Sequence, residues 1–173
     1  GACVPGSACG KEEFEQTPVV PNLFISLDRS CSMNQKATPG GASKWNEAVT
    51  ALSTLTAKFK GKIRWGLSLF PDKLKDAAGS KCFQETKPLA CANDNEAALV
   101  QRLTAFENVP GEPCITPING AVLEMQQTLE IDPNHPTFAV LITDGKQRGC
   151  GLEAGAEEAR QMLVDLATDG IKT

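Results

Sequence analysis

The sequence predicts an α/β fold, with a doubly wound and mostly parallel central sheet that has helices on both faces. Apolar runs of strand length alternate with stretches whose apolar residues repeat at the helical period. The connections between them are short enough for right-handed crossovers between parallel strands. Two of the apolar runs end at a carboxylate, Asp28 and Asp144. Because ligands of such sheets bind beyond the carboxyl ends of the strands, these two acids mark a candidate site.

Size and composition indicate one globular domain. The 173 residues, 41% hydrophobic and 22% charged, are enough for one sizeable core. A net charge of −4 with no basic cluster argues against a nucleic-acid partner or an anionic membrane surface. No apolar stretch approaches the ~18 residues of a membrane span, so we expect no transmembrane segment in this chain. Residues 1–10 lack the regions of a signal peptide, so the chain is expected to be processed or trimmed.

The first half of the chain predicts an arm followed by strand, helix and strand. Residues 1–21, rich in Gly, Pro and Cys, form a linker or small disulfide-closed arm, and residues 22–173 form the domain. The first strand covers Leu23 to Leu27, an apolar run typical of burial on both faces. A helix that Gly61 can end follows, with these residues on one face: Trp45, Ala48, Val49, Leu52, Leu55 and Phe59. The second strand alternates from Ile63 to Leu69 and stops at Pro71.

The middle of the chain is predicted to hold an edge excursion and two helices. Residues 72–95 are irregular and charged, which suits a small excursion at an edge of the sheet. Asp94 is expected to cap a helix with these residues on one face: Leu99, Val100, Leu103 and Phe106. After a Pro-rich loop, Thr116 is the expected N-cap and Pro117 the first residue of the next helix. That helix is predicted to bury four residues: Ile118, Val122, Met125 and Leu129.

The end of the chain predicts the central strand and a last helix. Residues 137–143 are the most apolar run and the best candidate for a central strand, which ends at Asp144. The last helix is expected to turn these residues inward, with Gly170 behind it: Ala156, Ala159, Leu163 and Leu166. Ile171 and Lys172 look like the start of a further strand. A sheet that stopped there would expose the edge of its central strand, so we expect the natural polypeptide to be longer, or to have been cut here with its remainder still docked.

Seven cysteines are many for a cytosolic protein of this length. None forms a Cys-x-x-Cys pair, and the single histidine is His135, so a structural zinc site has little support. Disulfides formed in an oxidising compartment explain them better. The candidates fall into two short-range pairs, Cys3 with Cys9 and Cys82 with Cys91, and a group of three in loops at one end of the sheet: Cys31, Cys114 and Cys150. In this group, Cys114 is expected to pair with Cys150 or with Cys31.

The oxygen-bearing residues after the first strand are the candidate metal ligands. Asp28, Ser30 and Ser32 alternate and supply only hard oxygen donors, which suit Mg²⁺, Mn²⁺ or Ca²⁺ and suit zinc or copper poorly. A turn held by local side-chain hydrogen bonds would use the same residue types. The three residues alone leave these two interpretations about even.

The stretch Asp28-Arg29-Ser30-Cys31-Ser32-Met33 resembles the Asp-x-Ser-x-Ser motif of von Willebrand factor type A (vWA) domains, which opens their metal-ion-dependent adhesion site (MIDAS). The run from Phe138 to Gly145 is similar to the later-strand signature of that family. The resemblance covers roughly residues 22–173 and implies five metal ligands: Asp28, Ser30, Ser32, Thr116 and Asp144. Two positions depart from the family: Cys31 replaces the usual Gly, and Cys114-Ile115 replaces the small residues common before the Thr.

The resemblance implies a binding module for proteins rather than an enzyme. Mg²⁺ prefers six ligands, so five protein oxygens leave a position for an outside oxygen, which an Asp or Glu of a partner protein fills in the family. The implied setting is extracellular, at a cell surface or in the periplasm, and the cysteine-containing arm and the Trp45 helix resemble bacterial members.

Two alternatives remain open at this point. Asp28 could be the phosphoryl-accepting nucleophile of a metal-dependent enzyme of the haloacid-dehalogenase kind. That chemistry usually has a second Asp two positions on, where this chain has Ser30, and no Lys is evident in the expected partner loop. The other alternative is a purely structural module that holds a metal without a ligand.

Overall fold

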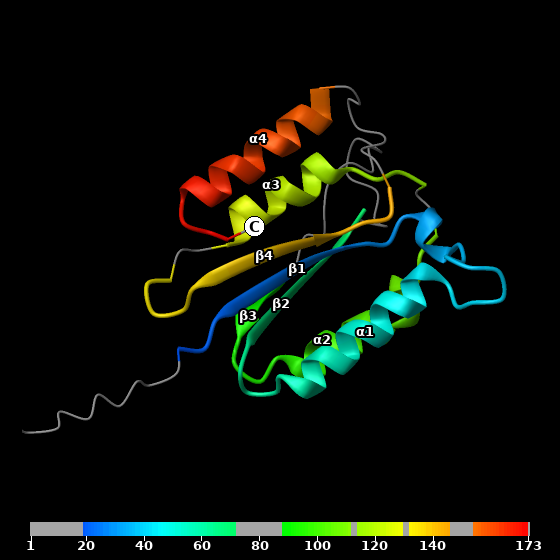
Figure 1. Ribbon diagram of the computed structural model, residues 1–173, viewed down its shortest axis with the longest axis horizontal. Helices are drawn as coiled ribbons and strands as arrows, with labels where there is room; N and C mark the ends of the chain where they lie inside the picture. Colours follow the sequence, from blue (N-terminus) through cyan, green and yellow to red (C-terminus); the bar gives the residue numbers. More distant parts are fainter. Residues whose placement is uncertain (1–18, 72–87, 112–113, 130–131, 146–153, 173) are drawn as a thin grey trace, which may run out of the picture.

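The structure is a computed structural model that describes residues 19–71, 88–111, 114–129, 132–145 and 154–172. Within these ranges a four-stranded sheet is packed between helices (Figure 1). The strands are β1 (Asn22–Asp28), β2 (Arg64–Phe70), β3 (Leu89–Ala92) and β4 (Thr137–Ile142). The α-helices are α1 (Lys44–Lys58), α2 (Glu96–Thr104), α3 (Ile118–Thr128) and α4 (Ala154–Thr168), and two short 3₁₀ helices are η1 (Cys31–Asn34) and η2 (Phe106–Asn108).

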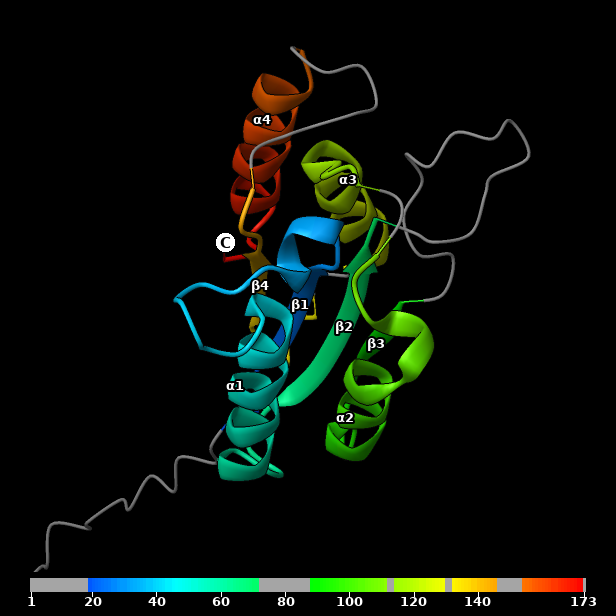
Figure 2. The same ribbon diagram turned by 90° about the vertical axis from the view of Figure 1, so that its right-hand side faces the viewer.

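The strand order is β3-β2-β1-β4, so the first strand lies inside the sheet. β1 is parallel to both of its neighbours, β2 and β4, whereas β3 runs antiparallel to β2. Helices α1 and α2 cover one face and α3 and α4 the other (Figures 1 and 2). The predicted doubly wound α/β architecture is therefore confirmed. Of the excursion predicted for residues 72–95, residues 72–87 lie outside the described ranges, and the rest includes the short edge strand β3.

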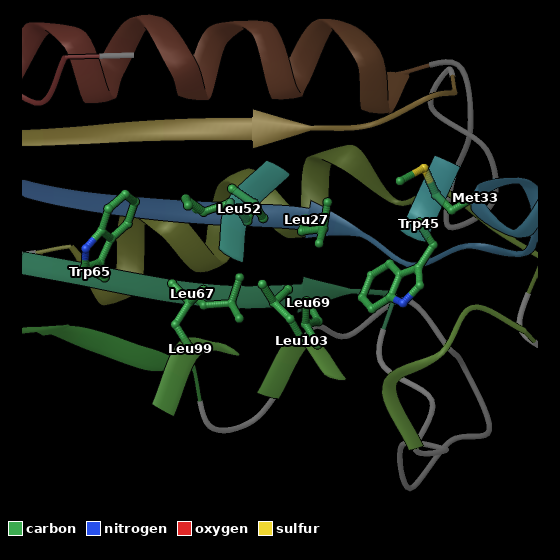
Figure 3. Packing of buried hydrophobic residues seen from close by; sticks show 10 residues of the cluster. Leu27, Met33, Trp45, Leu52, Trp65, Leu67, Leu69, Leu99 and Leu103 are labelled. Carbon is green, nitrogen blue, oxygen red and sulfur yellow. The ribbon is translucent and has the colours of Figure 1, made fainter. Parts of the chain in front are cut away.

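Two hydrophobic cores lie on the two faces of the sheet. Side chains of β1 and β2 meet those of α1 and α2 in the first core (Figure 3), whose buried members are Ile25, Leu27, Met33, Trp45, Leu52, Trp65, Leu67, Leu69, Leu99 and Leu103. On the other face, Phe24 meets the apolar sides of α3 and α4. A strand with a core on each face needs apolar residues at successive positions, which is why β1 appears in the sequence as an apolar run from Leu23 to Leu27 that only Ser26 interrupts.

Several local predictions differ from the structure. Asp94 does not cap α2, because its backbone is left-handed with φ of 57° and Asn95 is the residue that precedes the helix. Thr116 is not the N-cap of α3, since the helix begins at Ile118 after Pro117. Phe106 is 89% exposed, because α2 ends at Thr104 and the chain turns into η2 before reaching it.

Two further differences concern α1 and the last strand. Leu55 of α1 is 41% exposed, so the apolar face of this helix is narrower than its sequence predicted. β4 is the end strand of the four-stranded sheet, but it has a neighbour beyond it: Phe138 and Lys172 form a parallel bridge. Ala139 N donates to Lys172 O at 2.8 Å, and Lys172 N donates to Thr137 O at 3.0 Å. The predicted start of a further strand is thus present as a single bridge.

No helix in the described part of the chain is long and apolar enough to cross a membrane.

Candidate metal centre

The parallel pairing of β1 and β4 brings Asp28 and Asp144 to the same end of the sheet. Leu27 lies opposite Ile142 in the register, so both strands end at the same level. Asp28 is the last residue of β1, and Asp144 lies just past the end of β4. In Figure 1 both strands run toward this end, where η1 also lies.

A chain of hydrogen bonds joins four of the predicted ligands. Ser30 N donates to Asp28 Oδ1 at 2.7 Å, and the hydroxyl oxygens of Ser30 and Ser32 are 3.0 Å apart. Ser32 Oγ then donates to Asp144 Oδ1 at 2.7 Å. The Asp-x-Ser-x-Ser loop and the end of β4 therefore form one continuous cluster of oxygen atoms.

Asp28 is the most enclosed member of this cluster. Its residue surface is fully buried, and Thr143 Oγ1 donates to its second oxygen, Oδ2, at 2.7 Å. Burial raises the pKa of Asp28 above its usual value, although hydrogen bonds from Thr143 and Ser30 oppose this and the charge of Asp144 adds to it. Asp28 accepts hydrogen bonds only from neutral groups here, so a cation beside this buried carboxylate would stabilise its charged form.

Thr116 reaches the cluster from a separate loop. It is 5% exposed, and a Cβ atom added to Gly145 would lie 3.4 Å from Thr116 Oγ1. Because Gly145 follows Asp144 directly, the Thr116 hydroxyl lies at the turn that carries this carboxylate. All five predicted ligands are therefore at one end of the sheet.

A disulfide joins the loop of Ser30 and Ser32 to the loop of Thr116. Cys31 is bonded to Cys114, so the structure contains one of the two pairings expected for Cys114. The predicted Cys82–Cys91 pairing is wrong in this structure, because Cys91 is a free thiol. The Cys91 side chain lies beside Gly66, where an added Cβ would be 2.8 Å from its Sγ, and it packs against the core that contains Phe24. The remaining candidates lie outside the described residues: Cys3, Cys9, Cys82 and Cys150.

Arg29 attaches the loop that follows β1, which carries Ser30 and Ser32, to neighbouring parts of the fold. Its side chain is buried, and Nε donates to Pro71 O at 2.8 Å while Nη1 donates to Asn108 Oδ1 at 2.7 Å. Its backbone N donates to Phe70 O at 2.6 Å. The loop is thus fixed to the end of β2 and to η2, which restricts the positions of the two serines that follow.

Two polar residues of this site are absent from the sequence prediction. Lys44, the first residue of α1, places Nζ 2.5 Å from Asp144 Oδ2, and Thr143 donates to Asp28. Thr143 had a signal, since it directly precedes the second strand-end acid. Lys44 had a weaker one, a cation at the start of a helix, where the helix dipole disfavours positive charge.

The donor set fits a small, hard divalent cation. Two carboxylates and three hydroxyls supply oxygen ligands alone, which Mg²⁺, Mn²⁺ and Ca²⁺ prefer. Within the described ranges, no group of three or more His, Cys, Asp or Glu side chains could hold a metal, so a site rich in thiols or imidazoles is not found there. The buried Asp28 and the ammonium of Lys44 at Asp144 both indicate that the cluster attracts positive charge.

No protein-family model matches this sequence, and no curated protein matches it. Solved structures do match. BatB from Bacteroides thetaiotaomicron matches with a TM-score of 0.61 and 22% identity, over 87% of this chain and 63% of that chain. Proximal thread matrix protein 1 from the mussel byssus, in a structure with a zinc-occupied MIDAS motif, matches with a TM-score of 0.57 and 13% identity, over 88% and 36%. The SpRpn10 VWA domain matches with a TM-score of 0.53 and 10% identity, over 88% and 72%.

The fold is therefore that of a von Willebrand factor type A domain. The resemblance inferred from the Asp-x-Ser-x-Ser motif and the later-strand signature is confirmed at the level of the fold. The chain spans 63% of the BatB chain, so it corresponds to a part of that protein.

Proposed function

We propose that this domain binds a divalent cation at Asp28, Ser30, Ser32, Thr116 and Asp144, and binds a partner protein through that cation. The observation that carries the proposal is the hydrogen-bonded chain from Asp28 through Ser30 and Ser32 to Asp144 Oδ1. It joins two strand ends that are far apart in the sequence. A turn held by local hydrogen bonds would account for the first three residues but not for the inclusion of Asp144.

The chemistry follows from the number and kind of ligands. A bound Mg²⁺, Mn²⁺ or Ca²⁺ would supply a Lewis-acid position that five protein oxygens leave incomplete. An Asp or Glu carboxylate of a partner can fill that position, and the partly dehydrated setting strengthens the contact. Asp28 and the two serines would hold the ion, while Thr116 and Asp144 would adjust its remaining ligands.

The disulfide supports a location outside the reducing cytosol, extracellular, at a cell surface or in the periplasm. Cys31 stands between Ser30 and Ser32 and is bonded to Cys114, and a disulfide of this kind persists in an oxidising compartment. Several structures with this fold carry the names of surface proteins, including a pilus adhesin from Lactobacillus rhamnosus and a minor pilin from Streptococcus sanguinis. A binding function at a bacterial surface agrees with these points.

Calorimetry tests the metal site. The purified protein should bind about one divalent ion per chain, with Mg²⁺ or Mn²⁺ preferred to Zn²⁺ because every ligand is oxygen. Ser32→Ala and Asp28→Ala should lower the affinity severely, whereas the matched control Asp169→Ala, an exposed acid after the end of α4, should not. Equal affinity in all four proteins would refute the site.

The partner function has its own test. Binding to an immobilised partner should disappear with EDTA, weaken sharply in Thr116→Ala, and be competed by acidic but not by neutral peptides. A domain that binds the ion yet shows none of these effects would be a structural metal module. The phosphoryl-transfer alternative lacks the second Asp two positions after Asp28, where this chain has Ser30. Metal-dependent hydrolysis of p-nitrophenyl phosphate that Asp28→Asn abolishes would favour the enzyme instead.

A further inference from the structure

Lys44 crosses from the start of α1 to the oxygen cluster. Its Nζ lies 2.5 Å from Asp144 Oδ2, and the two side chains are 29% and 12% exposed. Asp144 is 100 positions away in the sequence. The ammonium therefore occupies the rim of the candidate metal site, partly sheltered from water, where its charge is screened less than at an open surface.

The position of Lys44 is unfavourable for the helix that carries it. The N-terminus of α1 is the positive end of the helix dipole, which disfavours a cation in the first turn. The helix has its own cap, since Ser43 Oγ accepts a hydrogen bond from Asn46 N. Lys44 is thus not required to begin α1, and its contact with Asp144 is the interaction that explains its charge.

The two carboxylates of the cluster are consequently unequal. Asp28 accepts hydrogen bonds from Ser30 N and Thr143 Oγ1, which are neutral donors. Asp144 gives Oδ1 to the neutral Ser32 hydroxyl and Oδ2 to the Lys44 ammonium. One of the two negative charges is therefore compensated within the chain before any external cation is bound.

We propose that Lys44 determines the ligand specificity of this site, a role that rests on the proposed metal-dependent function. With Lys44, two carboxylates and a divalent ion, the loaded site has a net charge of +1; without the ammonium it would be neutral. Lys44 therefore weakens the hold on the metal ion and strengthens the attraction for an incoming carboxylate. Neutral ligands gain nothing from this charge, so the site selects an acidic partner.

The test compares two affinities in each of four proteins: wild type, Lys44→Met, Lys44→Arg and Lys36→Met. Lys36 is the matched control, because it is exposed on the segment between η1 and α1 and its backbone bridges to Ser43, next to Lys44. Mn²⁺ affinity is measured by calorimetry, and acetate binding to the Mn²⁺-loaded protein by the relaxation of solvent protons. Acetamide serves as the neutral probe.

The expected effects have opposite signs. Lys44→Met should bind Mn²⁺ about tenfold more tightly, as expected for removing one unit charge a few ångströms from a divalent ion in water. The same variant should bind acetate about threefold more weakly, because a monovalent anion feels half that effect. Lys44→Arg should stay near wild type in both measurements, and so should Lys36→Met. Acetamide binding should not change in any variant.

The remaining outcomes distinguish a failure of the role proposed for Lys44 from a failure of the metal site itself. If wild type binds Mn²⁺ but Lys44→Met equals it in both affinities, the inference fails and the metal site stands. If both affinities fall together in Lys44→Met, Lys44 only positions Asp144 and the specificity role is refuted. If wild type binds no divalent ion, the proposed function fails, and this inference fails with it. Unchanged cooperative thermal unfolding shows that each variant is folded.

Discussion

Cys31 and Cys114 are bonded across 83 positions of the chain, and their Cα atoms lie 4.9 Å apart. Cys31 stands between Ser30 and Ser32, and Cys114 stands two residues before Thr116. The bond therefore fixes the loop after β1 against the loop before α3, and each loop carries candidate metal ligands. Covalent attachment of one part of the site to the other reduces the ordering needed when an ion is bound.

Removing this disulfide should lower both stability and metal affinity. The double variant Cys31→Ser/Cys114→Ser should lose up to about 4.5 kcal/mol of unfolding free energy, the loop-closure value for a ring of this size. Urea unfolding measures the loss, and a Mn²⁺ titration measures the affinity. A reductant that weakens Mn²⁺ binding in wild type should leave the double variant unaffected, which separates this bond from any other disulfide. If wild type and the double variant bind Mn²⁺ equally well in the absence of reductant, the bond does not organise the site.

Replacing Asp28 by Asn should remove metal binding without weakening the metal-free fold. Burial raises the pKa of Asp28, so the folded state binds this proton more tightly than the unfolded state does. The group therefore reduces the stability of the metal-free protein as pH rises from below its unfolded pKa to above its folded pKa, and the reduction is complete above that window.

Urea unfolding in EDTA at several pH values checks this sign. The stability of Asp28→Asn minus that of wild type should increase with pH across the acid range and then become constant. With Mn²⁺ present, wild type should gain stability and the variant should not. A difference that decreases with pH would show that a depressed pKa, and not burial, governs this carboxylate.

Cys91 should be slow to alkylate while the protein is folded. Burial raises the pKa of the Cys91 thiol to about 11. At pH 8 about one thiol in a thousand is then the reactive thiolate, against roughly a quarter for an ordinary cysteine. Iodoacetamide labelling followed by peptide mass spectrometry should show slow modification of Cys91 in the folded protein and rapid modification in urea. Equal rates in both states, or recovery of Cys91 in a disulfide-linked peptide, would contradict the structure.

Gly66→Ala should be destabilising because the space beside Gly66 is filled. An added Cβ would lie 2.7 Å from Phe24 Cδ2, 2.8 Å from Cys91 Sγ and 3.0 Å from Leu89 O. Overpacking of this kind costs about 1–3 kcal/mol. Gly111→Ala is the control, since a Cβ there meets nothing within 4 Å, and its effect should stay within about 0.5 kcal/mol. Thermal unfolding that ranks the two variants equally would refute this packing.

The central part of the fold could be predicted because burial leaves a direct trace in sequence. β1 has a core on each face, so Leu23 to Leu27 are almost uniformly apolar. Trp65, Leu67 and Leu69 are fully or almost fully buried on β2, as their alternation indicated. These signals depend on the residue itself and on its near neighbours, which a single sequence contains.

Other features depended on contacts that a single sequence does not contain. Asp94 has the usual chemistry of a helix cap, but Asn95 precedes α2 and its amide donates to Trp65 O and Ala90 O, which holds the turn against β2 and β3. The apolar spacing of the sequence continues at the helical period to Phe106, but the helix α2 ends at Thr104. Tertiary contacts and turns overrule local preference at both places.

The candidate site also contains some residues that the local sequence indicates and some contacts that it does not. Asp28, Ser30 and Ser32 are close in sequence, so their spacing and residue types made them candidates, and the resemblance to the Asp-x-Ser-x-Ser motif favoured a metal site over a local turn. Lys44 contacts Asp144 across the sheet end, and nothing local to either residue indicates the other. The partner of Cys114 could not be chosen for the same reason, because spacing alone does not show which loop end lies beside it.

The place of β1 between β2 and β4 also sets the order in which the protein can be made. β1 meets β2 across about 42 positions of the chain but meets β4 across about 115. While the chain is synthesised, one side of β1 therefore has no partner strand until residues 137–142 have left the ribosome. The pairing of β1 with β4 therefore forms late and slowly, as is usual for contacts of large sequence separation. Asp28 and Asp144 meet only at that step, so the nascent chain cannot assemble its oxygen cluster until β4 has paired with β1.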